Sequence, residues 1–188
     1  LYNRIVDRFD IICKTAFENQ IKILVDAEES WFQGAIDDIV LTMMIKYNSS
    51  ETIVYNTLQM YRHDRLLYLN KLKKMSIDKS FNVGIKLVRG AYIEKENKRA
   101  KKYNYKSTIC ESKDATDINF DKGAKFILSN LDHFSLFCGS HNEKSIYDIL
   151  DIMKNSNMHK KNPKIWFGQL YGMSDNITFN LAEEGYNV

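Results

Sequence analysis

Short apolar runs alternate with longer segments of helical periodicity along the whole chain, and this alternation most constrains the fold. The apolar runs predict strands at 22–30, 52–61, 83–92, 135–141 and 164–173. The periodic segments predict helices at 2–18, 32–46, 63–75, 115–131, 142–154 and from about 175 to Gly185, a residue suited to end a helix. Strands that are apolar on both faces are typical of a parallel sheet covered by helices. The sequence therefore predicts an α/β fold, either an open doubly wound sheet or a (βα)8 barrel of the TIM type.

The chain of 188 residues is long enough for a substantial core, and we expect a single domain over 1–188. Its net charge of +3 is too small to indicate nucleic-acid binding. No apolar run approaches the roughly 20 residues that cross a membrane, and LYNRIVDRFD at the start lacks the order of a secretory signal. Cys13, Cys110 and Cys138 show no CxxC spacing, so we expect free thiols in a reducing compartment and no metal site.

Polar residues occur where each predicted strand ends. In chain order these residues are Asp26 and Glu28, Gln59, Lys86 and Arg89, Ser140 and His141, and Gln169. Ligands bind at the carboxyl ends of the strands both in barrels and in doubly wound sheets. Five strand ends that all carry polar groups therefore predict one binding site.

The run GIKLVRGAYIEKE places Lys86 and Arg89 inside an otherwise apolar strand, where an uncompensated charge costs several kcal/mol. Strand alternation puts Lys86 on the same face as Val88, Gly90 and Tyr92. Lys86 could point into a ligand cavity, extend to a rim, or pair with Asp26 in a purely structural bridge. A glycine at a strand tip, here Gly90, permits a backbone to approach a ligand closely.

Three other features have two interpretations each. Asp26 could cap the following helix instead of serving a site. Ser140 and Glu143 fit a capping box, but a helix start after a strand also suits a phosphate, which His141 could then contact. The tract 95–106 is basic, which indicates a solvated helix face or loop, or a surface that binds anionic membrane lipid.

The strand-end motifs together resemble the proline dehydrogenase family, most closely its bacterial single-function form. VDAEESWFQGAID, NTLQMYRHDRL, GIKLVRGAY, SHNEKS and FGQLYGMSDN follow that family's order and spacing over essentially the whole chain. The resemblance implies a (βα)8 barrel that holds FAD at the carboxyl ends of its strands. It also implies hydride transfer from C5 of L-proline to flavin N5, formation of 1-pyrroline-5-carboxylate in proline catabolism, and electron transfer to a membrane quinone.

The resemblance further implies roles for individual residues. Lys86 matches the basic position beside flavin N5 and O4, where the family often has arginine, and Asp26 matches the active-site aspartate beside the proline pocket. The cofactor-binding positions that match are Ala27, Gln59, Lys86, Arg89, Gly90, Ala91, Ser140 and His141. Tyr92 and Leu170 match residues that pack around the substrate ring. No metal ligand is implied.

A full barrel has eight strands and about 250 residues, so we expect about five βα units here, without the first strands or the last strand and helix. The family's pattern includes an earlier strand lysine, and a later tyrosine and arginine pair that clamps the proline carboxylate. We therefore expect these 188 residues alone not to bind proline normally. The expected location is the cytoplasm, with at most peripheral contact with the inner membrane and no nucleic-acid partner.

Two other functions are compatible with the residues themselves. One is a different barrel enzyme that uses Lys86 to form a Schiff base with a carbonyl substrate. The other is an incomplete barrel that only binds a partner or serves as a structural piece. The sequence leaves open the identity of the quinone, the oligomeric state and any fusion to an aldehyde dehydrogenase.

Overall fold

The five predicted strands form one parallel sheet, and the strands lie in the order in which they occur along the chain. The computed structural model describes residues 1–188, with β1 (Ile23–Val25), β2 (Val54–Gln59), β3 (Val83–Val88), β4 (Phe134–Gly139) and β5 (Ile165–Gly168). A doubly wound sheet would require the strand order to reverse, so that alternative is wrong. Each strand pairs in parallel with its successor, and the sheet curls into half of a TIM-type barrel. The predicted α/β barrel fold, with about five βα units, is confirmed.

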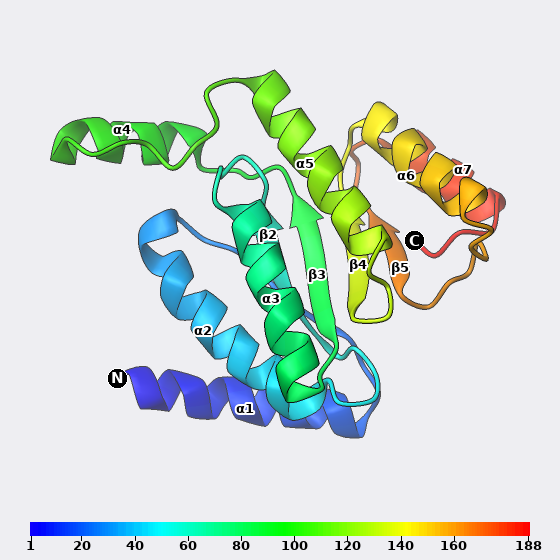
Figure 1. Ribbon diagram of the computed structural model, residues 1–188, viewed down its shortest axis with the longest axis horizontal. Helices are drawn as coiled ribbons and strands as arrows, with labels where there is room; N and C mark the ends of the chain where they lie inside the picture. The colour runs from blue at the N-terminus through cyan, green and yellow to red at the C-terminus, as the bar shows by residue number, and fades with distance from the viewer.

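Helices follow each strand and cover the outer face of this half-barrel (Figure 1). The helices are α1 (Tyr2–Glu18), α2 (Ser30–Tyr47), α3 (Arg65–Lys79), α4 (Ile93–Tyr103), α5 (Lys113–Leu128), α6 (Glu143–Asn155) and α7 (Asp175–Glu183). Helices α2, α3 and α5 contact the sheet, and α1 packs on α2 beyond the amino ends of the strands. Helix α4, which we expected only as a helix face or loop, extends away from the other elements.

The apolar core lies between the outer face of the sheet and these helices. Strand residues with buried side chains, such as Leu58, Ile85 and Leu136, belong to one cluster of 30 buried residues together with Leu69 and Phe120 of the helices. Because the strands alternate, the remaining strand residues point to the inner face. The core thus fixes which side chains are available to a site inside the barrel.

The inner face is closed near the amino ends of the strands by small and hydroxylated residues. Thr52 and Ser135 join their hydroxyl groups at 2.8 Å, and both side chains are buried. Gly84 of β3 lies between these two residues. It has to be glycine, because a Cβ at this position would stand 2.7 Å from Thr52 Cγ2 and 2.8 Å from the ring of Tyr55. These residues form a floor, so space for a ligand remains only toward the carboxyl ends.

Two expected helix caps are wrong. Helix α6 is capped by Asn142, whose side chain accepts a hydrogen bond from the Ser145 amide at 3.0 Å. Ser140 instead accepts from the Asn142 amide at 3.1 Å and lies in the turn between β4 and α6. Helix α2 begins after Glu29, so Asp26 does not cap it.

The three cysteines are free, as predicted. Burial raises the pKa of the Cys13 thiol to about 11 and that of Cys138 to about 12, which keeps both thiols protonated and unreactive at neutral pH. No helix combines the length and the apolar character that crossing a bilayer requires.

Candidate active site

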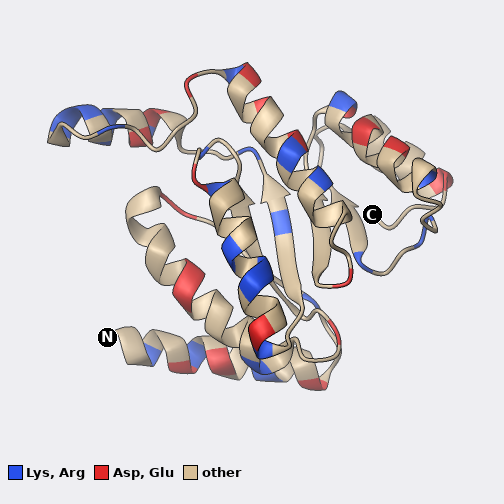
Figure 2. Ribbon diagram, viewed as in Figure 1, with Lys and Arg blue, Asp and Glu red and all other residues tan.

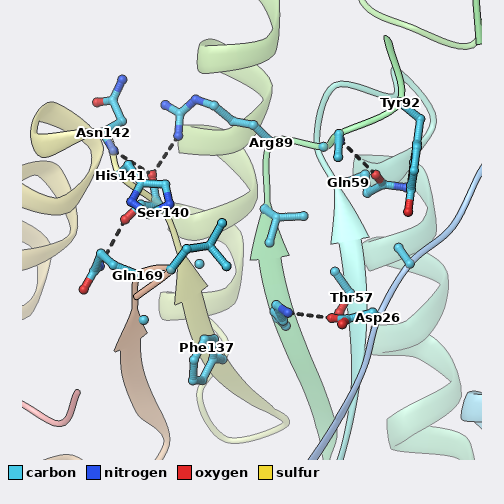
Figure 3. Close-up of a pocket in the computed structure, with 18 of the residues that line it drawn as sticks. Asp26, Thr57, Gln59, Arg89, Tyr92, Phe137, Ser140, His141, Asn142 and Gln169 are labelled. Carbon is cyan, nitrogen blue, oxygen red and sulfur yellow. Dashed lines mark hydrogen bonds and ion pairs between the residues drawn. The ribbon is translucent and has the colours of Figure 1, made fainter. Parts of the chain in front are cut away.

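A cavity of about 780 Å³ opens at the carboxyl ends of the strands (Figure 3). Its volume falls in the range of small-molecule and cofactor sites. Every residue that the sequence assigned to a site contributes to its lining: Asp26, Ala27, Gln59, Lys86, Arg89, Gly90, Ala91, Tyr92, Ser140, His141 and Leu170. The structure therefore brings all of these residues together, and their individual roles stay predictions.

Lys86 points into the cavity from the inner face of β3 and pairs with Asp26 in the segment after β1. Its Nζ donates a hydrogen bond to Asp26 Oδ1 at 2.6 Å, although the two residues are 60 positions apart. The Lys86 side chain is 24% exposed and that of Asp26 is 77% exposed. The ammonium group is thus compensated by a carboxylate that remains mostly in solvent. Lys86 thus both points into the cavity and pairs with Asp26. A pair of this kind contributes little to folding.

Gln59, at the end of β2, connects the loops on either side of it. Its side-chain nitrogen donates to the Glu28 carbonyl at 2.8 Å, and its side-chain oxygen accepts from the Ala91 amide at 3.3 Å. Gln59 is buried. Because both ends of the amide are used, Gln59 holds the segment after β1 and the turn after β3 in a fixed relation around the cavity.

Arg89 has its polar groups satisfied within the protein. Its guanidinium donates to Asp117 Oδ1 at 2.5 Å, to Ser140 Oγ at 2.9 Å and to Ser145 Oγ at 2.9 Å, and it stacks over the ring of Phe120. Protein groups thus compensate the charge of Arg89, which also lines the cavity. Arg89 ties the end of β3 to α5 and to the start of α6.

Asp117, the acidic partner of Arg89, receives a second cation. Lys113 donates to Asp117 Oδ2 at 2.6 Å. The hydrogen bonds from Lys113 and Arg89 hold the pKa of Asp117 below its usual range, despite the opposing effect of partial burial. The carboxylate is therefore fully charged at neutral pH and anchors this side of the cavity.

Gly90 is required by the backbone and by a neighbouring ring. Its φ is +125°, a conformation that other residues rarely adopt. A Cβ at this position would lie 2.2 Å from two ring atoms of Tyr61. The absence of a side chain at Gly90 thus allows the Tyr61 ring to lie close against the backbone. Ala91 and Tyr92 continue the turn along the cavity.

The end of β4 presents Ser140, His141 and Asn142 at the start of α6, and Figure 3 shows their hydrogen bonds. Gln169 supports them from β5, since its nitrogen donates to the Ser140 carbonyl at 3.0 Å and its oxygen accepts from Thr178 at 2.7 Å. His141 Nδ1 is buried and has no hydrogen-bond partner. A buried polar atom without a partner is unusual, so this nitrogen is available to a ligand.

The sequence analysis missed several residues on the cavity wall. These are Thr57, Lys113, Phe137, Gly139, Asn142 and Gly168, while Val88 was placed on the face of Lys86, and Glu28 and Gln169 were expected at strand ends, all three without a role. Thr57 Oγ1 is buried and has no partner. Counting back two residues from Gln59 would have found Thr57, and the same alternation from Gly139 leads to Phe137.

An apolar part of the cavity wall lies between Lys86 and His141. A Cβ on Gly168 would lie 2.4 Å from the ring of Phe137, and one on Gly139 would lie 2.9 Å from Val88 Cγ1. Phe137 and Val88 therefore cross over glycines of the next strand. The cavity thus combines an apolar surface with Lys86 on one side and His141 on the other.

A second charged cluster lies outside the barrel and supports α2 and α3. Asp37, which is buried, accepts hydrogen bonds from Arg65 at 2.8 Å, Gln33 at 2.9 Å and Asn56 at 2.8 Å. Arg65 also binds Asp64 at 2.6 Å. Burial would raise the pKa of Asp64, but hydrogen bonds from Arg65 and its neighbour Arg62 outweigh it and lower this pKa to about 2. No group of three potential metal-ligating side chains occurs in the structure.

Comparisons with known proteins agree with this arrangement. A family model described as proline dehydrogenase matches residues 3–188. Human "Proline dehydrogenase 1, mitochondrial" is 32% identical over 98% of this chain and 31% of its own length. "Hydroxyproline dehydrogenase" of Xenopus laevis is 35% identical over 97% of the chain and 40% of its own length. The chain spans about a third of the length of the human relative.

Solved structures show the same fold. Proline utilization A from Bdellovibrio bacteriovorus, inactivated by N-propargylglycine, superposes with a TM-score of 0.91 over 99% of this chain and 19% of its own length, at 19% sequence identity. At this identity the likeness concerns the fold alone. The match to the family model, by contrast, extends over nearly every residue that builds the half-barrel and its cavity, and by this match the chain belongs to the proline dehydrogenase family.

Proposed function

We propose that the protein is an FAD-dependent dehydrogenase that oxidises L-proline to 1-pyrroline-5-carboxylate and passes the electrons to a membrane quinone. Membership of the proline dehydrogenase family supports the reaction class. The observation that carries the proposal is the convergence of Lys86, Asp26 and His141 on one cavity at the strand ends. The protein would act in the cytoplasm, with at most peripheral contact with the inner membrane.

The cavity suits a flavin in three respects. Its volume of about 780 Å³ is that of a cofactor site. Its wall is apolar at Val88 and Phe137, as a flat aromatic ring requires. It also contains two buried polar atoms without partners, Thr57 Oγ1 and His141 Nδ1, and a polar cofactor edge would satisfy them. The residues that would hold FAD are Ala27, Gln59, Lys86, Arg89, Gly90, Ala91, Ser140 and His141.

When bound, FAD would supply the hydride acceptor for C5 of proline. Lys86 would hold a positive charge on the wall where negative charge develops during the reaction, and an oriented charge of this kind is worth several kcal/mol in a site that excludes water. Asp26 keeps Lys86 in place through Oδ1. Its other oxygen, Oδ2, is free to accept a hydrogen bond from the cationic ring nitrogen of proline.

Other residues would position these groups and enclose the substrate. Gln59 and Arg89 hold the loops around the cavity through their hydrogen bonds. Tyr92 and Leu170 lie on the cavity lining, where their side chains would pack around the pyrrolidine ring. Leu170 is 67% exposed in this chain, so we expect its burial to increase when substrate binds.

A Schiff-base enzyme is supported less well, because Lys86 Nζ is engaged by Asp26 at 2.6 Å. A nucleophilic lysine must present an unengaged amine to a carbonyl carbon. A function limited to partner binding would not explain why Thr57 Oγ1 and His141 Nδ1 are buried in the cavity without hydrogen-bond partners. Neither alternative accounts for the membership of the chain in the proline dehydrogenase family.

The test uses the full-length protein that carries this chain. After purification, its visible absorbance shows whether flavin is bound, and anaerobic addition of L-proline should bleach that absorbance. Trapping with o-aminobenzaldehyde should then detect 1-pyrroline-5-carboxylate, with trans-4-hydroxy-L-proline as the comparison substrate. A colourless protein, a flavin that proline does not bleach, or a borohydride-trapped adduct on Lys86 would each overturn the proposal.

A further inference from the structure

Helix α4 carries a concentration of positive charge on the one helix that stands away from the rest of the protein. In Figures 1 and 2 it extends outward beyond the carboxyl end of β3, with its basic residues toward the far end and its acidic residues near the base. The basic residues of the helix are Lys95, Lys98, Arg99, Lys101 and Lys102, against Glu94 and Glu96. Because the net charge of the whole chain is only +3, this charge is local.

Contacts at the base of α4 fix which of its faces is turned outward. Glu96 is buried and accepts hydrogen bonds from the amide of Ser30 at 2.5 Å and from its hydroxyl at 2.7 Å. Lys95 pairs with Glu29 at 2.9 Å. Glu96 and Lys95 therefore attach α4 to the start of α2, and the attachment orients the helix, whereas Glu94 is exposed and takes no part in it.

The opposite face of α4 consists of three lysines without partners. Lys98, Lys101 and Lys102 are exposed and make no hydrogen bond or ion pair in the structure. At 100° per residue they lie opposite the buried residues Glu96 and Ala100. Glu94 lies on the same face at 100° per residue but pairs with none of them, and Lys102 Nζ lies 5.2 Å from the centre of the Tyr103 ring. The face therefore keeps an excess of positive charge, which suits an anionic surface.

Aromatic side chains adjoin the basic residues of α4: Tyr103 lies under Lys102, and Trp31, which neighbours Phe32, lies under Arg99. Phe32 is 58% exposed and Tyr103 is 56% exposed, and Trp31 is also partly exposed. Arg99 lies between the rings of Trp31 and Tyr103, at 4.4 Å and 4.8 Å. Aromatic rings next to long basic side chains are typical of surfaces that lie at the boundary between lipid and water.

We propose that this surface, defined by Lys98, Lys101 and Lys102 with Trp31 and Phe32 at its margin, binds an anionic lipid bilayer. The inference rests on the proposed function, because a membrane quinone would be the electron acceptor. Helix α4 begins at Ile93, directly after its N-cap residue Tyr92, which lines the cavity. Contact between α4 and a bilayer would thus bring the cavity mouth close to the membrane, where a lipid-dissolved acceptor is found.

A lipid surface fits these observations better than a nucleic acid does. Single strands bind in positively charged grooves with aromatic rings on which bases stack. Here the charge lies on a projecting helix, and Arg99 already occupies the faces of two of the rings. A convex basic helix with exposed apolar side chains instead matches a helix that lies in the plane of a membrane interface.

The experiment measures binding of the chain to vesicles of phosphatidylcholine, with or without phosphatidylglycerol, by flotation at about 0.1 M salt. The test variant is Lys98→Gln, Lys101→Gln and Lys102→Gln in one chain. The matched control removes three exposed lysines of α3 by Lys71→Gln, Lys74→Gln and Lys79→Gln. Circular dichroism and the urea midpoint should be unchanged in both, because exposed glutamine is a good helix former.

We expect binding only to vesicles that contain phosphatidylglycerol. Each lysine near such a surface contributes about fivefold to partitioning, so the α4 variant should bind about 100-fold more weakly, and the α3 variant should bind as the unmodified chain does. In a Trp166→Phe background, the fluorescence of Trp31 should shift to the blue on binding, and bromine-labelled lipid should quench it.

Several results would overturn the inference. These are no binding to anionic vesicles, an equal loss in the α3 variant, unchanged binding in the α4 variant, or tighter α4-dependent binding to an oligonucleotide than to vesicles. The measurement needs no cofactor, substrate or turnover. It can therefore fail while proline oxidation succeeds, or succeed while proline oxidation fails.

Discussion

The substitution Lys86→Met removes one ammonium group from the cavity wall and leaves a side chain of nearly the same length. Its effects on folding and on chemistry should differ greatly. The partner of Lys86, Asp26, is 77% exposed, and methionine keeps the apolar contacts of the lysine stem. The free energy of unfolding should therefore change little, while proline oxidation should fall sharply.

The structure sets both magnitudes. Ion pairs with a solvent-exposed member contribute about 0–1 kcal/mol, so the loss of stability should stay below about 1 kcal/mol. Removal of one oriented group from a site where charge develops costs about 100- to 1000-fold in rate, which corresponds to about 3–4 kcal/mol. The difference between these two values is large enough to measure.

Two assays read the two effects separately. Urea denaturation followed by circular dichroism gives the stability of the chain, and rapid anaerobic mixing with L-proline gives the rate of flavin bleaching in the full-length protein. Lys86→Arg is the control, since it keeps the charge and matches the residue that the family often has at this position. The arginine variant should recover most of the rate.

The reasoning would be refuted in either of two ways. A loss of stability above about 2 kcal/mol would mean that the pair with Asp26 is mainly structural. A bleaching rate within about threefold of the unmodified protein would mean that the ammonium group does not act on the reaction.

Three further changes test other parts of the structure by urea denaturation. Gly90→Ala should cost about 3–5 kcal/mol, because a Cβ would be forced into a positive φ and against the ring of Tyr61. Asp37→Ala should cost about 3 kcal/mol, because it leaves the buried guanidinium of Arg65 without its inner carboxylate. Asp64 has a pKa lowered from 3.8 to about 2, so its contribution should be complete above about pH 4 and disappear toward pH 2. After a discount for its partial exposure, this contribution is about 1–2 kcal/mol.

The contradicting outcomes are equally definite. A Gly90→Ala chain as stable as the unmodified one would show that the turn can relax around Tyr61. For the buried pair, Asp37→Asn keeps the shape of the side chain but loses the charge, so it should be destabilised about as much as Asp37→Ala, and an asparagine variant as stable as the unmodified chain would exclude the charge as the cause. For Asp64, the difference in stability between the unmodified chain and Asp64→Asn should shrink on acidification, and a constant difference would refute the linkage.

The strands themselves and the place of the cavity could be predicted because both follow from local patterns, whereas the choice between a doubly wound sheet and a barrel came only from the family resemblance. Apolar runs bounded by polar residues mark the strands, and the carboxyl ends of parallel strands meet at one edge. The alternation of side chains along a strand also placed Lys86 and Gly90 correctly on the inner face of the sheet. Thr57 and Phe137 obey the same alternation, so they could have been found with the rule already in use.

Pairing between distant charged residues could not be predicted. Arg89 meets Asp117 across 28 positions and Ser145 across 56, and Asp37 meets Arg65 across 28. No local pattern marks such partners, because each choice depends on how helices pack on the sheet. The projection of α4 could not be predicted for the same reason, since its base is fixed by the long-range contacts of Glu96 with Ser30 and of Lys95 with Glu29.

The hydroxyl bridge between Thr52 and Ser135 has a consequence for how the hollow of the barrel can vary. The bridge passes beneath β3 only because residue 84 has no side chain. A single methyl group there would lie 2.5 Å from the Val54 carbonyl oxygen, 2.7 Å from Thr52 Cγ2 and 2.8 Å from the Tyr55 ring, so this floor would have to shift. The depth of the cavity thus depends on residue 84, which does not line the cavity. Substitutions at Gly84 should therefore change which ligands fit inside without changing any residue that contacts the ligand.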